Sequence, residues 1–85
     1  MAQAVRFYFD MVPERVFEGF AAGGTWNGFD NVKVTLGVAH AIDAEFAGDD
    51  CDPVTEIEPD ADGLIDLSGG YTTVILGEGE EPPRD

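Results

Sequence analysis

The chain has 85 residues, an apolar fraction of 44% and a formal net charge of −14. One small domain fits this length, and the aromatic and β-branched content is that of a folded chain rather than a disordered one. The charge disfavours direct binding to nucleic acids or anionic membranes, whose phosphates would repel this surface, and favours basic protein partners or cations.

The first third of the chain predicts an antiparallel strand pair. Residues 4–10 (AVRFYFD) alternate between two faces, which is the period of a strand. Pro13 cannot donate to a strand ladder and indicates a turn or bulge, after which residues 15–20 are expected to pair back on the first strand. Residues 21–31 are rich in glycine and asparagine and predict a loop, and residues 32–34 predict a brief strand.

A single helix is predicted over residues 35–47. Thr35 is a suitable N-cap and Gly48 a suitable stop. Between them, apolar side chains recur at spacings of three and four and form one stripe, which should face a sheet. The stripe consists of Leu36, Ala39, Ile42 and Phe46, and we expect Leu36, Ile42 and Phe46 to face the sheet.

The second half of the chain predicts three more strands. Residues 54–58 and 64–67 are predicted to form a hairpin around a turn at PDADG, and residues 71–76 the most apolar strand. The resulting order, ββ(β)αβββ, predicts an α+β fold: a small antiparallel β-sheet of four or five strands packed on one face by a single helix. Residues 1–76 should form this domain, and residues 77–85 a disordered acidic tail.

The cysteine content and the apolar pattern bear on the compartment. Cys51 is the single cysteine, which rules out an internal disulfide and fits a reducing environment. The N-terminus lacks the basic and apolar segments of a secretory signal, and no apolar run approaches the ~20 residues that span a bilayer. We therefore expect a soluble cytoplasmic protein.

Two glycine-containing motifs flank the predicted helix: TWNGF before it and DGLIDLSGGYT after it. They resemble motifs of a group of small proteins of uncharacterised activity that are encoded largely by phages, plasmids and other mobile elements. The matching residues are Trp26, Asn27, Gly28 and Phe29, then Gly63, Leu64, Gly69, Gly70 and Tyr71. The resemblance implies a mobile-element setting, and it carries no catalytic residue.

Reactive residues do not form a recognisable catalytic or metal-binding set. Residues 58–69 partly resemble a calcium-binding loop, but Gly69 stands where a closing bidentate carboxylate is needed. His40 lies three residues before Asp43, yet no nucleophile motif accompanies the pair, and one histidine with one cysteine cannot complete a zinc site. We predict no catalytic residue, no metal and no cofactor, and a protein that is not an enzyme.

The strongest signal is the acidity of residues 48–66, which hold eight carboxylates and no base. Two of these acids follow the helix, where its dipole favours cations, so their placement costs stability. Glu56 and Glu58 would share one face of a predicted strand, roughly 6.7 Å apart, and duplex DNA also presents regularly spaced charges. The predicted partner-binding residues are Asp49, Asp50, Asp52, Glu56, Glu58, Asp60, Asp62 and Asp66, joined by the loop aromatics Trp26 and Phe29.

Two functions remain open from the sequence. The first is a non-enzymatic interaction protein that binds a basic protein surface, as an inhibitor or DNA mimic acting on a nucleic-acid-binding or defence protein. The alternative is an acidic protein of a salt-loving organism, whose charge serves solubility and whose binding role lies elsewhere. Trp26 and Phe29 are open to a similar choice, between a binding surface and a plug at the end of the sheet.

Overall fold

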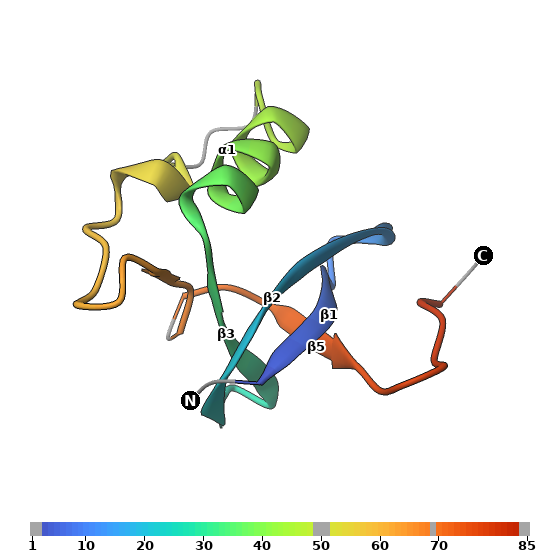
Figure 1. Cartoon of the computed structure of the whole chain (residues 1–85). Helices are drawn as coiled ribbons and strands as arrows, with labels where there is room; N and C mark the ends of the chain where they lie inside the picture. The colour runs from blue at the N-terminus through green and yellow to red at the C-terminus, as the bar shows by residue number, and fades with distance from the viewer. Residues whose placement is uncertain (1–2, 49–51, 69, 84–85) are drawn as a thin grey trace.

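The computed structural model describes residues 3–48, 52–68 and 70–83. Within these residues, five strands form one antiparallel sheet in the spatial order β4-β3-β2-β1-β5, and one α-helix joins β3 to the second half of the chain (Figure 1). The elements are β1 (Ala4–Phe9), β2 (Val12–Trp26), β3 (Phe29–Val34), α1 (Leu36–Glu45), the 3-10 helix η1 (Val54–Glu56), β4 (Ile65–Asp66) and β5 (Thr73–Leu76). The predicted α+β class, with a single helix packed on the sheet, is confirmed.

The pairing of β1 with β2 follows the sequence prediction. Phe7 lies opposite Phe17 and Tyr8 opposite Val16, but Phe9 lies opposite Val12, so residues 13–15 bulge out of the ladder. Pro13 sits in this irregular stretch, where its missing N–H leaves no ladder bond unmade. The predicted bulge is confirmed.

The predicted loop over residues 21–31 is wrong, because β2 continues to Trp26. The chain then reverses through Asn27 and Gly28, whose φ angles of 50° and 84° are both positive. Positive φ at both central residues is the requirement of a two-residue hairpin turn that matches strand twist, and Asn-Gly is its strongest sequence signal. That signal was present in the sequence, and the general glycine content of the segment obscured it.

The sheet curls so that β3 reaches β5, although two strands separate them in the sheet order. The carboxylate of Asp30 on β3 accepts a hydrogen bond from the backbone N–H of Ile75 at 2.9 Å, and its carbonyl accepts one from the Thr73 hydroxyl. These bonds satisfy polar groups on the outer side of β5. The Ile75 N–H is thereby unavailable for pairing with another chain along this edge strand.

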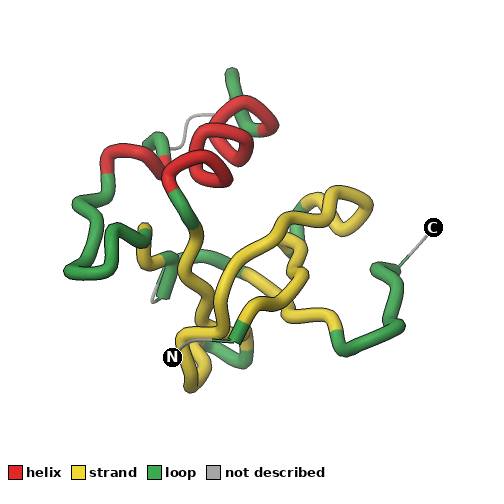
Figure 2. The backbone as a smooth tube through the Cα atoms, viewed as in Figure 1, coloured by secondary structure: helices red, strands yellow, loops and turns green. Residues whose placement is uncertain are grey.

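The core lies between the curled sheet and α1. Phe7, Phe9 and Phe17 form its centre, with ring centroids 5.7 to 6.0 Å apart, and Ala39 and Ile42 of the helix complete it. In Figure 2 the helices lie together at one end of the molecule and the strands at the other.

The predicted helix is confirmed in position and only partly in orientation. The Thr35 hydroxyl accepts a hydrogen bond from the N–H of Val38 at 3.3 Å, as an N-cap does. Ile42 is buried and Phe46, just beyond the helix, packs against the core. Leu36, however, is 50% exposed. It has the right helical phase, but it is the first residue of α1, and the helix side chains that pack on the core begin at Val38 and Ala39.

The predicted hairpin of residues 54–58 with 64–67 is also wrong. Residues 54–56 form η1, and β4 pairs with β3, placing Asp66 opposite Lys33 and Ile65 opposite Val34. The PDADG turn does exist, since the N–H of Gly63 donates to the carbonyl of Asp60 at 2.9 Å. The apolar spacing of residues 54 and 57 suits a 3-10 turn as well as a strand, so alternation alone did not distinguish them.

The C-terminal segment is described as far as Pro83. The Glu80 carboxylate accepts a hydrogen bond from the N–H of Gly77 at 2.6 Å, and Arg6 of β1 donates to the Glu80 carbonyl at 2.9 Å. Among the described residues, no helix has the length and apolar character needed to cross a membrane.

Candidate functional site

The acidic loop, defined here as residues 52–66, leads from the end of α1 through η1 to β4. Five of its carboxylate residues are exposed: Asp52, Glu56, Glu58, Asp62 and Asp66. Two further predicted binding residues, Asp49 and Asp50, lie outside the described residues. Glu56 belongs to a 3-10 helix rather than a strand, so the regular spacing expected between Glu56 and Glu58 loses its basis.

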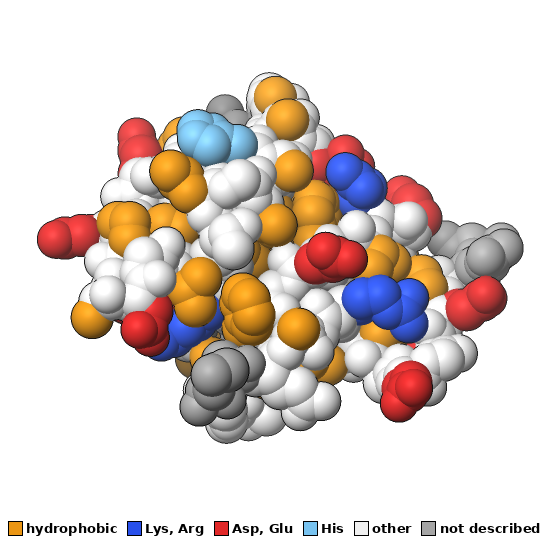
Figure 3. Space-filling model, in the orientation of Figure 1, with side chains coloured by type: hydrophobic (Ala, Val, Ile, Leu, Met, Phe, Trp, Pro, Cys, Tyr) orange, Lys and Arg blue, Asp and Glu red, His pale blue; other side chains and the backbone are white. Residues whose placement is uncertain are grey.

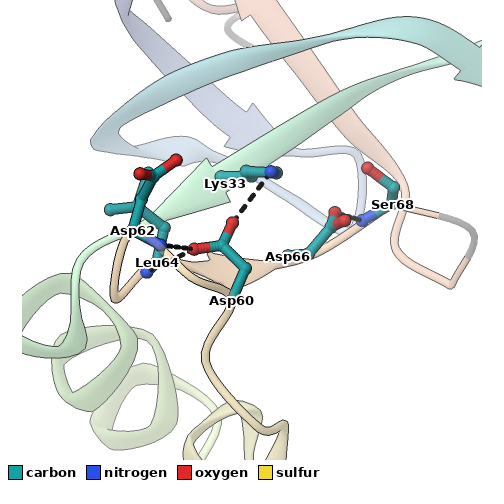
Figure 4. A network of polar contacts seen from close by, with 6 residues as sticks. All are labelled: Lys33, Asp60, Asp62, Leu64, Asp66 and Ser68. Atoms are coloured by element: carbon teal, nitrogen blue, oxygen red, sulfur yellow. Dashed lines mark hydrogen bonds and ion pairs between the residues drawn. The ribbon is translucent and has the colours of Figure 1, made fainter.

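Asp60 differs from the other acids of this loop because it is half-buried and fully hydrogen-bonded (Figure 4). One carboxylate oxygen accepts from Lys33 Nζ at 2.8 Å, and the other accepts from the backbone N–H groups of Asp62 and Leu64 at 2.9 and 3.0 Å. The Lys33 hydrogen bond, followed by the backbone bonds, holds the pKa of Asp60 below its usual value. Asp60 therefore shapes the turn.

The acidic loop holds no base of its own, but Lys33 of β3 reaches it. It is 27 residues before Asp60 in the chain, and the pairing of β3 with β4 brings the two together. The hydrogen bond and charge of Asp60, with smaller contributions from Asp66 and Asp62, raise the pKa of Lys33. Because Lys33 is paired with Asp60, the exposed acids still give the surface of the loop a net negative charge.

The calcium-loop hypothesis gains no support from this geometry. The oxygens of Asp60, its central ligand, already bond to Lys33 and to two backbone N–H groups. Asp66 accepts from the N–H of Ser68 at 2.8 Å. In the part of the chain that the structure describes, no three histidine, cysteine, aspartate or glutamate residues are grouped so as to hold a metal ion.

Asp43 has a structural partner that the sequence did not reveal. Its carboxylate accepts hydrogen bonds from the N–H of Val54 at 2.6 Å and from the N–H and hydroxyl of Thr55 at 3.1 and 2.7 Å. Burial by itself raises the pKa of Asp43, but the bonds from Thr55 and Val54 outweigh it and lower the pKa below its usual value. Asp43 thus ties η1 to α1, while His40 is exposed.

The two aromatic candidates lie away from the acidic loop. Trp26 and Phe29 face each other across the β2–β3 turn, and Trp26 is 37% exposed whereas Phe29 is half-buried. Phe29 begins β3, while Lys33, which contacts the acidic loop, lies near its end, roughly 13 Å further along the strand. Among the residues that the structure describes, the predicted acids and the two aromatics therefore lie at different places on the sheet.

The remaining described bases also have partners. Arg15 Nε lies 3.6 Å from Glu45 Oε2, and the Arg15 guanidinium lies 4.8 Å from the centre of the Phe17 ring. Figure 3 shows one face of the molecule, on which hydrophobic side chains reach the surface near the middle and most acidic side chains lie toward the margin. Exposed apolar groups bordered by acids are thus a feature of this surface.

Comparison of the chain with known protein families, with curated protein sequences and with solved structures found no match. The fold and site define a small α+β domain with an exposed acidic loop.

Proposed function

We propose that this protein is a non-enzymatic, cytoplasmic interaction protein that binds a basic protein surface through its acidic loop. The observation that carries the proposal is that most acids of the loop have no cation beside them among the described residues. Lys33, the base that reaches it, is held by Asp60, whereas Asp52, Glu56, Glu58, Asp62 and Asp66 are exposed without an ion pair among the described residues. Exposed like charges of this density attract a surface of opposite charge and accelerate its association.

The shape of the loop supports a defined surface. Asp60 and Asp43 hold its two ends by backbone hydrogen bonds, so the exposed acids are carried on a fixed chain path. A partner then meets preformed charges and loses less conformational freedom on binding. Nucleic-acid-binding proteins of a host are the partners that a mobile-element protein of this charge would meet, and blocking their basic surfaces would make it an inhibitor.

Solubility in a salt-rich cell is the competing explanation, and one observation favours it. Exposed acids also occur far from the loop, among them Asp10, Glu14, Glu18 and Glu78. Under this explanation the position of an acid is unimportant and only the total charge matters.

A charge-matched pair of variants separates the two explanations. The loop variant changes Glu56, Glu58, Asp62 and Asp66 to the corresponding amides, and the control variant changes Asp10, Glu14, Glu18 and Glu78. Both variants lose four charges and keep Asp43 and Asp60. Basic proteins captured from a lysate of the source organism are compared at low and physiological salt, and the affinity of each recovered partner is then measured.

The proposal requires that the loop variant lose the partner and that the control retain it. The association rate of the wild type should also fall as salt rises, because salt screens exposed charges over about 8 Å at physiological ionic strength. Equal weakening of both variants would show that only net charge matters, and no weakening would show that the loop merely faces water.

A further inference from the structure

An apolar cavity of about 360 Å³ opens where the end of α1 meets the β1–β2 turn and the chain before β5. Phe9 and Phe46 form part of its wall, with ring centroids 5.3 Å apart and planes at 85°, and Tyr71 continues the wall, its ring 6.3 Å from that of Phe9. Aromatic edges and faces in this arrangement suit a large apolar group better than a polar one.

Met11 stands at the rim of this cavity with 70% of its surface exposed, more than either other large exposed hydrophobic residue described, Trp26 or Leu36. An exposed methionine costs free energy in water, and a contact that covers it is favourable. Its unbranched, polarizable side chain adapts to partners of different shape.

The charge around the cavity restricts what enters it. Its described lining includes two carboxylates, Asp43 and Asp52, and no lysine, arginine or histidine. Asp43 is engaged by Val54 and Thr55, so Asp52 is the exposed charge at the cavity. Asp52 also begins the acidic loop, whose exposed acids continue along the chain from the cavity. Phosphates and carboxylates are repelled here, whereas an apolar group flanked by cations is complementary.

We propose that this cavity receives one large apolar side chain, aromatic or long aliphatic, from a basic peptide segment of the partner, with arginine or lysine on both sides of it. The apolar side chain fills the cavity against Phe9, Phe46 and Met11, and the flanking cations lie against Asp52 and the acidic loop. This inference rests on the proposed function and adds to it the specificity that charge alone lacks.

Two variants and three synthetic peptides test the inference. The peptides are Arg-Arg-Trp-Arg-Arg, the same sequence with glycine in place of tryptophan, and Ser-Ser-Trp-Ser-Ser. Met11→Gln removes an apolar contact at the rim, and Leu36→Gln is the matched control, because Leu36 is also exposed but does not line the cavity. Affinities come from fluorescence anisotropy, backbone amide shifts locate the peptide, and thermal unfolding confirms that each variant is folded.

The arginine-flanked tryptophan peptide should bind about tenfold more tightly than its glycine form, and amide shifts should change at Met11, Ala47 and Tyr71. Met11→Gln should reduce this tenfold ratio of affinities by about fivefold, whereas Leu36→Gln should leave the ratio unchanged. Equal binding of the tryptophan and glycine peptides, or an advantage that survives Met11→Gln in a folded variant, would overturn the cavity's role. Serine-flanked binding as tight as arginine-flanked binding would overturn the basic character of the segment.

Failure of this inference is distinguishable from failure of the proposed function. If only the cavity is misassigned, the glycine peptide still binds and loses affinity in the variant of Glu56, Glu58, Asp62 and Asp66. If the proposed function is wrong, that variant binds every peptide as its charge-matched control does.

Discussion

Different interactions hold the two halves of this chain. Residues 3–34 form β1, β2 and β3, which are joined by antiparallel backbone pairing, interrupted by a register shift in each pair, and by a cluster of phenylalanines. Residues 36–48 and 52–68 hold α1, η1 and β4, where the carboxylate of Asp43 bonds η1 to α1 and that of Asp60 bonds the turn before β4. Both halves contribute to one core, but a pattern of apolar residues organises the first, and single polar contacts organise the loop of the second.

The acids of the second half have two roles. Asp43 and Asp60 accept backbone hydrogen bonds and set the path of the chain, whereas Glu56, Glu58 and Asp62 are exposed. Neutralising all of them together would confuse a loss of binding with a loss of loop structure. Each acid variant below therefore changes an acid of one role and leaves the acids of the other role intact.

The largest expected effect is in the first half. Phe7 is fully buried and contacts Phe9 and Phe17, so Phe7→Ala should lower the free energy of unfolding by about 3–5 kcal/mol. Urea unfolding measures the change, and Met11→Ala, at an exposed site, is the control. A loss below about 1 kcal/mol would mean that the phenylalanine cluster is not the centre of the core.

A smaller loss is expected in the second half when Asp43 is changed. Asp43→Asn keeps the shape of the side chain but removes the charge that accepts bonds from Val54 and Thr55, and should cost about 1.5–3 kcal/mol. Hydrogen exchange should accelerate at the amides of Val54 and Thr55 while the β1–β2 ladder stays protected. Glu58→Gln removes one charge at an exposed site, and it should leave the free energy of unfolding and the hydrogen exchange unaltered. Equal effects of the two variants would contradict the structural role of Asp43.

Two glycine substitutions test close packing against open space. A Cβ at Gly19 would lie 2.8 Å from the carbonyl oxygen of Lys33, so Gly19→Ala should cost about 1–3 kcal/mol by forcing β2 and β3 apart. A Cβ at Gly37 of α1 meets nothing within 4 Å, so Gly37→Ala should stabilise the protein by about 0.5–1 kcal/mol. Thermal unfolding compares the two, and the same sign for both would contradict the packing described.

The smallest effect is the pH dependence of the Asp43 contribution. Its folded pKa lies below its unfolded value of about 3.9, so its stabilisation is fully present above that value and is lost as the pH falls through the folded pKa. Because acid also relieves repulsion among the other carboxylates, the informative quantity is the difference in unfolding free energy between wild type and Asp43→Asn. This difference should persist down to about pH 5 and shrink below about 4, and a difference that did not shrink in acid would contradict a role for the Asp43 charge in these hydrogen bonds.

The α+β class, the pairing of the first two strands with their bulge, and the position of α1 could all be predicted from the sequence. These features follow from local patterns: alternation in β1, a proline that cannot donate, and a threonine cap before an apolar stripe. The Asn-Gly turn could also be predicted from the sequence, although the high glycine content of residues 21–31 favoured a loop instead. Local patterns are reliable here because neighbouring residues alone create them.

Which acids are structural, and where the cavity lies, depend on contacts between residues far apart in the chain. Lys33 meets Asp60 across 27 residues, and Asp30 meets Ile75 across 45, so no local pattern announces either contact. The same holds for Phe9, Phe46 and Tyr71, which come from three separate segments to line one cavity. A carboxylate has the same letter whether it faces water or accepts hydrogen bonds. Where its donor lies far along the chain, as Lys33 does for Asp60 and Thr55 does for Asp43, only the folded structure distinguishes the two.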